Sequence, residues 1–134
     1  MPAKAKAKAL RRYINLPGRK APLPFHDAVL VGDTLYLSGR IGIDPETDAV
    51  PEDISQELRL LFDGFEAVLR EADMTMDDLV WVQVYSPDIS LWERFNAVYL
   101  QRFSNQLPAR AFIGSGPLMK GGRFEMLGVG VKRP

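Results

Sequence analysis

The chain has 134 residues, which suits a single domain around one hydrophobic core. Its 17 basic and 17 acidic side chains cancel, and this neutrality argues against a dedicated nucleic-acid binder. Cysteine is absent and histidine occurs once, which excludes disulfides, thiolate nucleophiles and metal sites of the usual kind.

The N-terminal end is basic. Residues 1–9 alternate alanine and lysine for most of their length, and we expect a disordered tail ahead of one domain over residues 10–134. An RNA-binding arm is the less favoured interpretation of this tail. No apolar segment follows it, and no apolar run approaches the ~20 residues of a membrane span. We therefore expect no membrane attachment and a cytoplasmic location.

The next segment predicts three strands. Residues 10–17 suit an edge strand, and residues 26–39 suit a β-hairpin. Within the hairpin, residues 28–31 and 34–37 are strand-like, and Gly32-Asp33 supplies the turn.

A helix is predicted after Asp53, which can act as N-cap with Gln56 as its capping-box partner. Apolar residues then recur every three or four positions and form one stripe: Ile54, Leu58, Leu61, Phe65, Val68 and Ala72. Residues 79–86 are rich in β-branched and aromatic side chains and predict a strand.

A second helix is predicted from Ser90, with Glu93 as its capping-box partner. Its apolar positions are Trp92, Phe95, Tyr99 and Phe103. A buried strand is expected to begin within residues 106–114, a glycine-rich loop covers residues 114–122, and residues 123–131 suit a last strand.

This order of elements predicts an α+β fold in which two helices pack on one face of a mixed sheet, because each helix links two strands. The other face would then be bare, and the strands are apolar on both sides: Tyr36, Trp81, Val82, Val84 and Tyr85. A bare apolar face in so short a chain needs a partner. We therefore expect a homo-oligomer whose sheets face inward.

Two charged residues interrupt apolar strands near the C-terminus. Arg110 follows Pro108, and Glu125 lies between Phe124 and Met126. Burial of a guanidinium costs free energy unless an anion pairs with it. The residues alone leave two interpretations with equal weight. One is a structural Arg110–Glu125 salt bridge. In the other, Arg110 binds a ligand carboxylate through two parallel hydrogen bonds, and Glu125 positions a water or moves a proton.

Other polar residues give weaker signals. His26 and Asp27 are neighbours on an extended segment and point to opposite sides, so we interpret His26 as structural or solvent-facing. Asn96 is the polar exception beside the apolar stripe of the second helix. The glycine-rich loop does not match a phosphate-binding loop and predicts a wide turn.

Four segments in register resemble the RidA/YjgF family of reactive-intermediate imine/enamine deaminases, which also carries the older label endoribonuclease L-PSP. They are LYLSGRIGIDPET (35–47), FNAVY (95–99), LPAR (107–110) and KGGRFEM (120–126). Their order and spacing agree from about residue 14 to residue 131.

The resemblance implies a chorismate-mutase-like fold and a homotrimer with three clefts between subunits. It also implies that Arg110 binds the substrate carboxylate, that Glu125 helps to activate the hydrolytic water, and that Asn96 and Ser38-Gly39 line the cleft. The implied reaction hydrolyses 2-imino or 2-enamino acids to 2-keto acids and ammonia without a cofactor or metal. An imine carbon is already electrophilic, so positioning and one proton-transfer group suffice.

The sequence departs from the family pattern near these motifs. Phe25 stands where the family usually carries a tyrosine, and Phe112 stands where a cysteine is common. Arg40, Gly64 and Asp73 replace a glutamine, an asparagine and a glycine. Phe25 and Phe112 belong to the predicted substrate-binding set and make it more apolar, which favours a different or bulkier substrate.

Three functions stay open. The favoured one is an imine/enamine deaminase. The second is a non-catalytic trimer that binds a small carboxylate such as a keto acid, which Phe25 and Phe112 motivate. The third is a ribonuclease, against which the neutral charge and the single histidine weigh.

Overall fold

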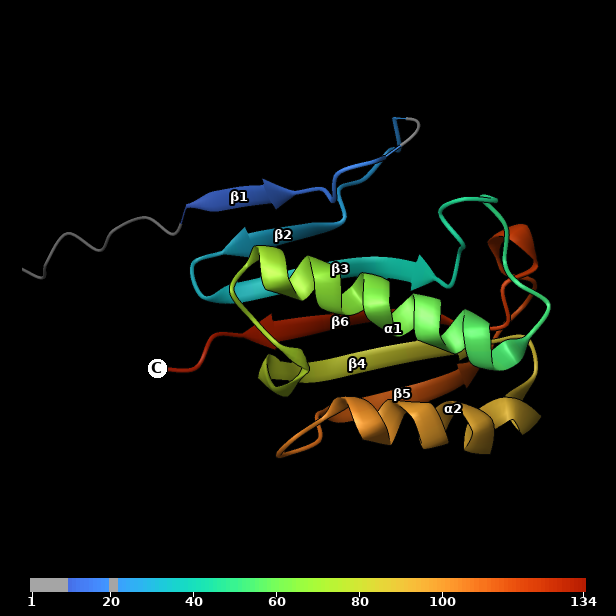
Figure 1. Cartoon of the computed structure of the whole chain (residues 1–134). Helices are drawn as coiled ribbons and strands as arrows, with labels where there is room; N and C mark the ends of the chain where they lie inside the picture. The colour runs from blue at the N-terminus through green and yellow to red at the C-terminus, as the bar shows by residue number, and fades with distance from the viewer. Residues whose placement is uncertain (1–9, 20–21) are drawn as a thin grey trace, which may run out of the picture.

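A mixed β-sheet forms one layer of the protein, and two helices form the other (Figure 1). The computed structural model describes residues 10–19 and 22–134, so the predicted tail over residues 1–9 lies outside the described residues. The strands are β1 (Arg11–Ile14), β2 (Ala28–Val31), β3 (Thr34–Ile41), β4 (Leu79–Ser86), β5 (Ala109–Gly114) and β6 (Glu125–Val131). The helices are α1 (Ile54–Glu71) and α2 (Trp92–Tyr99).

The strand order in the sheet is β1-β2-β3-β6-β4-β5. Neighbouring strands are antiparallel except β4 and β5, which are parallel. Helix α1 links β3 to β4, and β6 inserts between these two strands. Helix α2 links the neighbours β4 and β5, and Figure 1 shows both helices on the same face. The predicted α+β fold, with two helices on one face of a mixed sheet, is confirmed.

Helix α1 follows the predicted apolar stripe. Asp53 is its N-cap, and its carboxylate accepts the backbone N–H of Ser55. The reciprocal bond predicted from Gln56 does not form among the described residues. The stripe residues Leu58, Leu61, Phe65, Val68 and Ala72 are buried against the sheet. Among the described residues, neither helix combines the length and the apolar character that would let it cross a membrane.

The predicted start of the second helix is wrong. Ser90 lies in a 3₁₀ turn (Ile89–Leu91), and the carboxylate of Asp88 accepts both the backbone N–H and the hydroxyl of Ser90. Helix α2 itself begins at Trp92 and continues into a second 3₁₀ turn (Leu100–Arg102). The cap was misplaced because the aspartate, rather than the serine, holds the first turn.

The two faces of the sheet differ in burial. Val82 and Val84 lie under the helices and are fully buried, so they form the apolar side that the helices cover. Tyr36 and Trp81 remain on the bare face, with exposed fractions of 53% and 37%. The sheet therefore has an apolar face that no described element of this chain covers, as the sequence predicts.

Glu57 and Arg123 tie the helical layer to the start of β6. The side chain of Glu57 is fully buried, and its carboxylate accepts the backbone N–H of Arg123 at 2.7 Å and the guanidinium Nε at 2.6 Å. Arg123 Nη2 also donates to the backbone carbonyl of Pro51 at 2.6 Å. These bonds fix the chain just before Glu125.

Candidate functional site

Arg110 lies on β5, an edge strand that is only partly buried, so the expectation of a buried strand is wrong. It pairs with Val82 of β4 and projects on the helix-covered side. Its guanidinium carbon lies 4.6 Å from the ring centroid of Tyr99, 5.6 Å from that of Phe95 and 5.7 Å from that of Phe112. Three aromatic rings from α2 and β5 therefore hold this cation.

No carboxylate lies within ion-pair distance of Arg110 among residues 10–19 and 22–134. A guanidinium keeps its charge at any physiological pH, and ring faces attract it without neutralising it. The positive charge of Arg110 is therefore available to an anion that comes from outside this part of the chain.

A hollow of about 250 Å³ opens beside Arg110. Its lining comes from α2, the turn that follows it and the start of β5: Asn96, Tyr99, Leu100, Leu107, Pro108 and Arg110. The Oδ1 atom of Asn96 and the hydroxyl of Tyr99 are buried there without a hydrogen-bond partner among the described residues. Burial raises the pKa of the Tyr99 phenol, and the positive charge of Arg110 opposes this rise.

Unpartnered buried polar atoms are uncommon, because each costs about 1–3 kcal/mol. Here the amide of Asn96 and the hydroxyl of Tyr99 lie in one hollow with an uncompensated cation. The hollow can therefore accept a small anion that offers both hydrogen-bond donors and acceptors.

Glu125 does not contribute to this hollow. It pairs with Tyr85 on β4, three positions from the Val82 that pairs with Arg110. Because side chains alternate along a strand, Arg110 and Glu125 project from opposite faces of the sheet. Strand β4 also separates their two strands. The Arg110–Glu125 salt bridge considered from the sequence is therefore wrong for this chain.

The carboxylate of Glu125 lies over Gly39 of β3. A Cβ atom at Gly39 would collide with the Oε2 atom of Glu125, so only glycine leaves room for the carboxylate in this position. Glu125 forms no hydrogen bond or ion pair with the described part of the chain. It is thus a second free charge, separate from Arg110.

The segment before β2 lies near this second group. The Ser38 hydroxyl donates to the carbonyl of His26 at 2.6 Å, and Arg19 donates to the carbonyl of Phe25 at 2.5 Å. His26 Nδ1 bonds Asn15 at 3.0 Å, which fits the structural interpretation of this histidine. Phe25 is about half exposed.

The predicted site residues thus form two separate groups within the chain. Arg110, Asn96 and Phe112 lie together at the β5 edge. Ser38-Gly39 lies with Glu125 on the central strands, and Ser38 also reaches the segment that carries Phe25. Tyr99, Leu100, Leu107 and Pro108 were not predicted as site residues. The signal for Tyr99 was its spacing of three from Asn96, which places both on one side of a helix.

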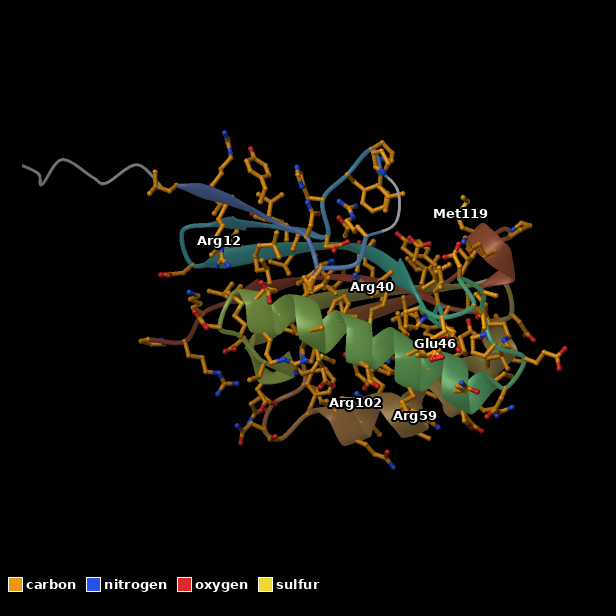
Figure 2. All side chains as sticks on the ribbon, turned by 45° about the horizontal axis from the view of Figure 1, so that its top comes forward. Arg12, Arg40, Glu46, Arg59, Arg102 and Met119 are labelled. Atoms are coloured by element: carbon orange, nitrogen blue, oxygen red, sulfur yellow. The ribbon has the colours of Figure 1, made fainter. Side chains whose placement is uncertain are left out.

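Two departures from the family pattern compensate each other. The guanidinium of Arg40 lies against Gly64 of α1, where a Cβ atom would come within 2.9 Å of Nη1; Figure 2 shows this arginine between β3 and α1. Burial lowers the pKa of Arg40, and the carboxylate of Asp27, 3.5 Å from its Nη2, acts in the opposite direction. The helical glycine therefore makes room for the larger side chain.

In the part of the chain that the structure describes, no three histidine or carboxylate side chains converge as metal ligands would. The arrangement defines a two-layer α+β protein with a cationic hollow at the edge of its sheet.

Comparisons with known proteins show which family has this fold and sequence pattern. The family model described as Endoribonuclease L-PSP matches residues 18–131. A RutC family protein of Saccharolobus solfataricus is 41% identical over 98 residues, which cover 70% of this chain and 78% of that protein. The 2-iminobutanoate/2-iminopropanoate deaminase of Bos taurus is 34% identical over 119 residues, which cover 86% and 87%.

Solved structures agree with these matches. RidA from an Antarctic Psychrobacter superposes with a TM-score of 0.78 at 31% identity and covers 84% of this chain and 91% of that one. The YjgF gene product of E. coli superposes with a TM-score of 0.78 at 28% identity, with coverage of 84% and 91%. The chain belongs to the RidA/YjgF family.

Proposed function

We propose that the protein hydrolyses 2-imino and 2-enamino acids to 2-keto acids and ammonia. The observation that carries this proposal is Arg110, a cation held by three rings with no carboxylate partner in the described chain. A substrate carboxylate would accept two parallel hydrogen bonds from its guanidinium fork. Asn96 and Tyr99 would then find partners in the same ligand. The deaminase names of relatives at about a third identity support this reaction class.

In the proposed reaction, water adds to the electrophilic imine carbon. Glu125 accepts a proton from this water and passes it to the imine nitrogen, which gives a tetrahedral carbinolamine. The hydroxyl proton then moves to the amine nitrogen in the same way. The C–N bond breaks, ammonia leaves, and the C=O bond of the keto acid forms. A positioned base with access to water is sufficient, because no covalent intermediate is required.

This chemistry needs Arg110 and Glu125 in one site, whereas a single chain holds them on opposite faces of its sheet. We propose that a homotrimer with inward-facing sheets brings the Arg110 of one subunit to the Glu125 of the next, with Ser38-Gly39 beside it. The exposed apolar face around Tyr36 and Trp81 supports such an assembly.

A coupled assay tests the reaction. A serine/threonine dehydratase generates the imine, and keto-acid formation is followed with and without the protein. We expect clear acceleration over spontaneous decay. Arg110→Met should abolish it, while Arg59→Met, at an exposed arginine of α1 (Figure 2), should not change it. Absence of acceleration with several amino-acid substrates would reject the proposal.

The second candidate is a non-catalytic binder of small carboxylates. Phe112 favours it, because its ring contacts Phe95 edge-on at 5.6 Å and fills a position where the family commonly has cysteine. Thermal stabilisation by a keto acid, without any acceleration of imine hydrolysis, would select this function.

A further inference from the structure

The segment that carries Phe25 is held by a chain of contacts that begins on helix α1. Gly64 of α1 leaves room for the guanidinium of Arg40, whose Nη2 atom lies 3.5 Å from the Oδ1 atom of Asp27. The same Oδ1 atom lies 3.9 Å from the Nε atom of Arg19. Arg19 in turn donates to the carbonyl of Phe25, and its guanidinium carbon lies 5.7 Å from the centroid of the Phe25 ring. Three departures from the family pattern, Gly64, Arg40 and Phe25, therefore belong to one chain of contacts.

Asp27 is the centre of this chain. Its side chain is only 10% exposed, and its Oδ2 atom accepts the backbone N–H of Leu16 at 2.7 Å. Its own backbone N–H donates to the side chain of Asn15 at 3.1 Å, and its carbonyl accepts the backbone N–H of Ser38 at 3.0 Å. Two guanidinium groups thus share one carboxylate in a largely buried setting, where solvent ions screen charge interactions weakly. Loss of either the Arg40 cation or the Asp27 charge should loosen the whole segment.

The same segment adjoins the group that contains Glu125. The Ser38 hydroxyl donates to the carbonyl of His26, the residue after Phe25, and the next residue of β3, Gly39, leaves space for the Glu125 carboxylate. The Phe25 side chain is 46% exposed, so part of its ring is free to face a ligand. The place of this ring relative to Glu125 therefore depends on how the segment before β2 is held.

We propose that Arg40 is a positioning residue for the Phe25 ring. It acts through Asp27 and Arg19 and fixes the ring as one wall of the cleft in which Glu125 acts. This inference rests on the proposed function. The contacts that carry it all join residues of one chain, so subunit assembly is not needed to form them.

A double-mutant cycle on imine hydrolysis tests this role. Phe25→Ala and Arg40→Met should each lower kcat/KM by about fivefold, which lies within the range of coupling found for residues of one network. The double variant should also lose about fivefold, whereas independent effects would multiply to roughly 25-fold. Arg40→Lys keeps a cation near Asp27 and should retain most of the rate. Independent losses in the double variant would overturn the inference. If Arg40→Met does not fold, Asp27→Asn takes its place in the cycle, because the amide oxygen can still accept the Leu16 N–H.

Arg102→Met is the matched control. Arg102 is also largely buried and contacts two carboxylates, Asp63 at 3.0 Å and Glu66 at 2.8 Å, on the same helix α1 (Figure 2). Its effect on kcat/KM should be the same in the wild-type and the Phe25→Ala backgrounds. Coupling of Arg102 to Phe25 as large as that of Arg40 would overturn the inference, because it would then reflect a general loosening of the helical layer.

Amide hydrogen exchange separates this inference from the proposed function. Arg40→Met and Asp27→Asn should speed exchange at Leu16 and at residue 27, whose N–H groups are bonded within the network, and Arg102→Met should not. If no imine is hydrolysed but exchange rises in this pattern, the deaminase proposal fails and the positioning of Phe25 by Arg40 stands. Unchanged exchange in Arg40→Met and Asp27→Asn would overturn the inference even if the wild type hydrolyses imines.

Discussion

Replacement of Arg123 by methionine should lower the free energy of unfolding by about 3 kcal/mol, because it leaves the buried carboxylate of Glu57 without its cation. Loss of one partner of a buried pair costs about 3–5 kcal/mol. The lower end applies here, since the backbone N–H of Arg123 still donates to Glu57. The bond from the Arg123 guanidinium to the Pro51 carbonyl is lost as well, so about 3 kcal/mol is the least that we expect.

The assay is urea denaturation at a fixed protein concentration, because subunit association would contribute to the apparent stability. The matched control is Lys120→Met, which removes the 2.8 Å ion pair with Asp48 at the surface. Exposed pairs contribute about 0–1 kcal/mol, so this variant should change little. Addition of Glu57→Gln to Arg123→Met should recover part of the loss. An Arg123→Met variant no less stable than Lys120→Met would refute the reasoning.

Three other predictions concern the site and the response to pH. Phe112→Leu removes one of the three rings that hold Arg110. The loss of about 1 kcal/mol of binding free energy should raise KM for an imino acid about fivefold and leave kcat nearly unchanged. An unchanged KM would contradict this prediction. Gly39→Ala places a methyl group where the Glu125 carboxylate lies and should displace that carboxylate. We expect kcat to fall at least about tenfold and the melting temperature to change little. An unchanged kcat would count against a role for Glu125. The pKa of Asp77 is lowered, first of all by a backbone N–H bond from Ser104. Its stabilising effect is therefore present above the unfolded-state pKa near 3.9 and is lost as pH falls through the lower folded-state pKa. Asp77→Asn should thus be less stable than the wild type at neutral pH. The difference between the two proteins in the free energy of unfolding, measured by denaturation, should shrink as pH falls below about 4.

The elements with strong local signals were predicted well. The run of β-branched and aromatic residues over 79–86 coincides with β4, and the turn at Gly32-Asp33 joins β2 to β3. Gly32 has a φ of 59°, a conformation that glycine adopts without strain. The position of a strand or of a tight turn depends on the residue types within a few positions of it. These elements can therefore be predicted from short stretches of sequence.

The arrangement of the site could not be derived in this way. The last strand, β6, inserts between β3 and β4, and this long-range pairing places β4 between Arg110 and Glu125. Two charges of opposite sign on apolar strands therefore suggested a salt bridge that the strand order prevents. Of the three rings around Arg110, the sequence places Phe95 and Tyr99 on the apolar side of the second helix and Phe112 in the substrate-binding set. Their meeting at one cation depends on how α2 packs over β5, which the sequence does not display.

The pair Arg40 and Gly64 shows the same limit. Each was recognised as a departure from the family pattern, but their compensation depends on the register between β3 and α1. An arginine that replaces a glutamine needs extra volume, and the helical glycine opposite supplies it. Only the packing shows that the two changes belong together.

The central claim is that Arg110 and Glu125 act together across a subunit boundary, and subunit mixing tests it most directly. Homo-oligomers of Arg110→Ala and of Glu125→Gln should each be inactive on imines. When the two variants are dissociated, mixed in equal amounts and reassembled, about a quarter of the clefts would combine an intact Arg110 with an intact Glu125 from the neighbouring subunit. The account predicts recovery of about a quarter of the wild-type rate. No recovery from a mixture shown to contain mixed oligomers would contradict it.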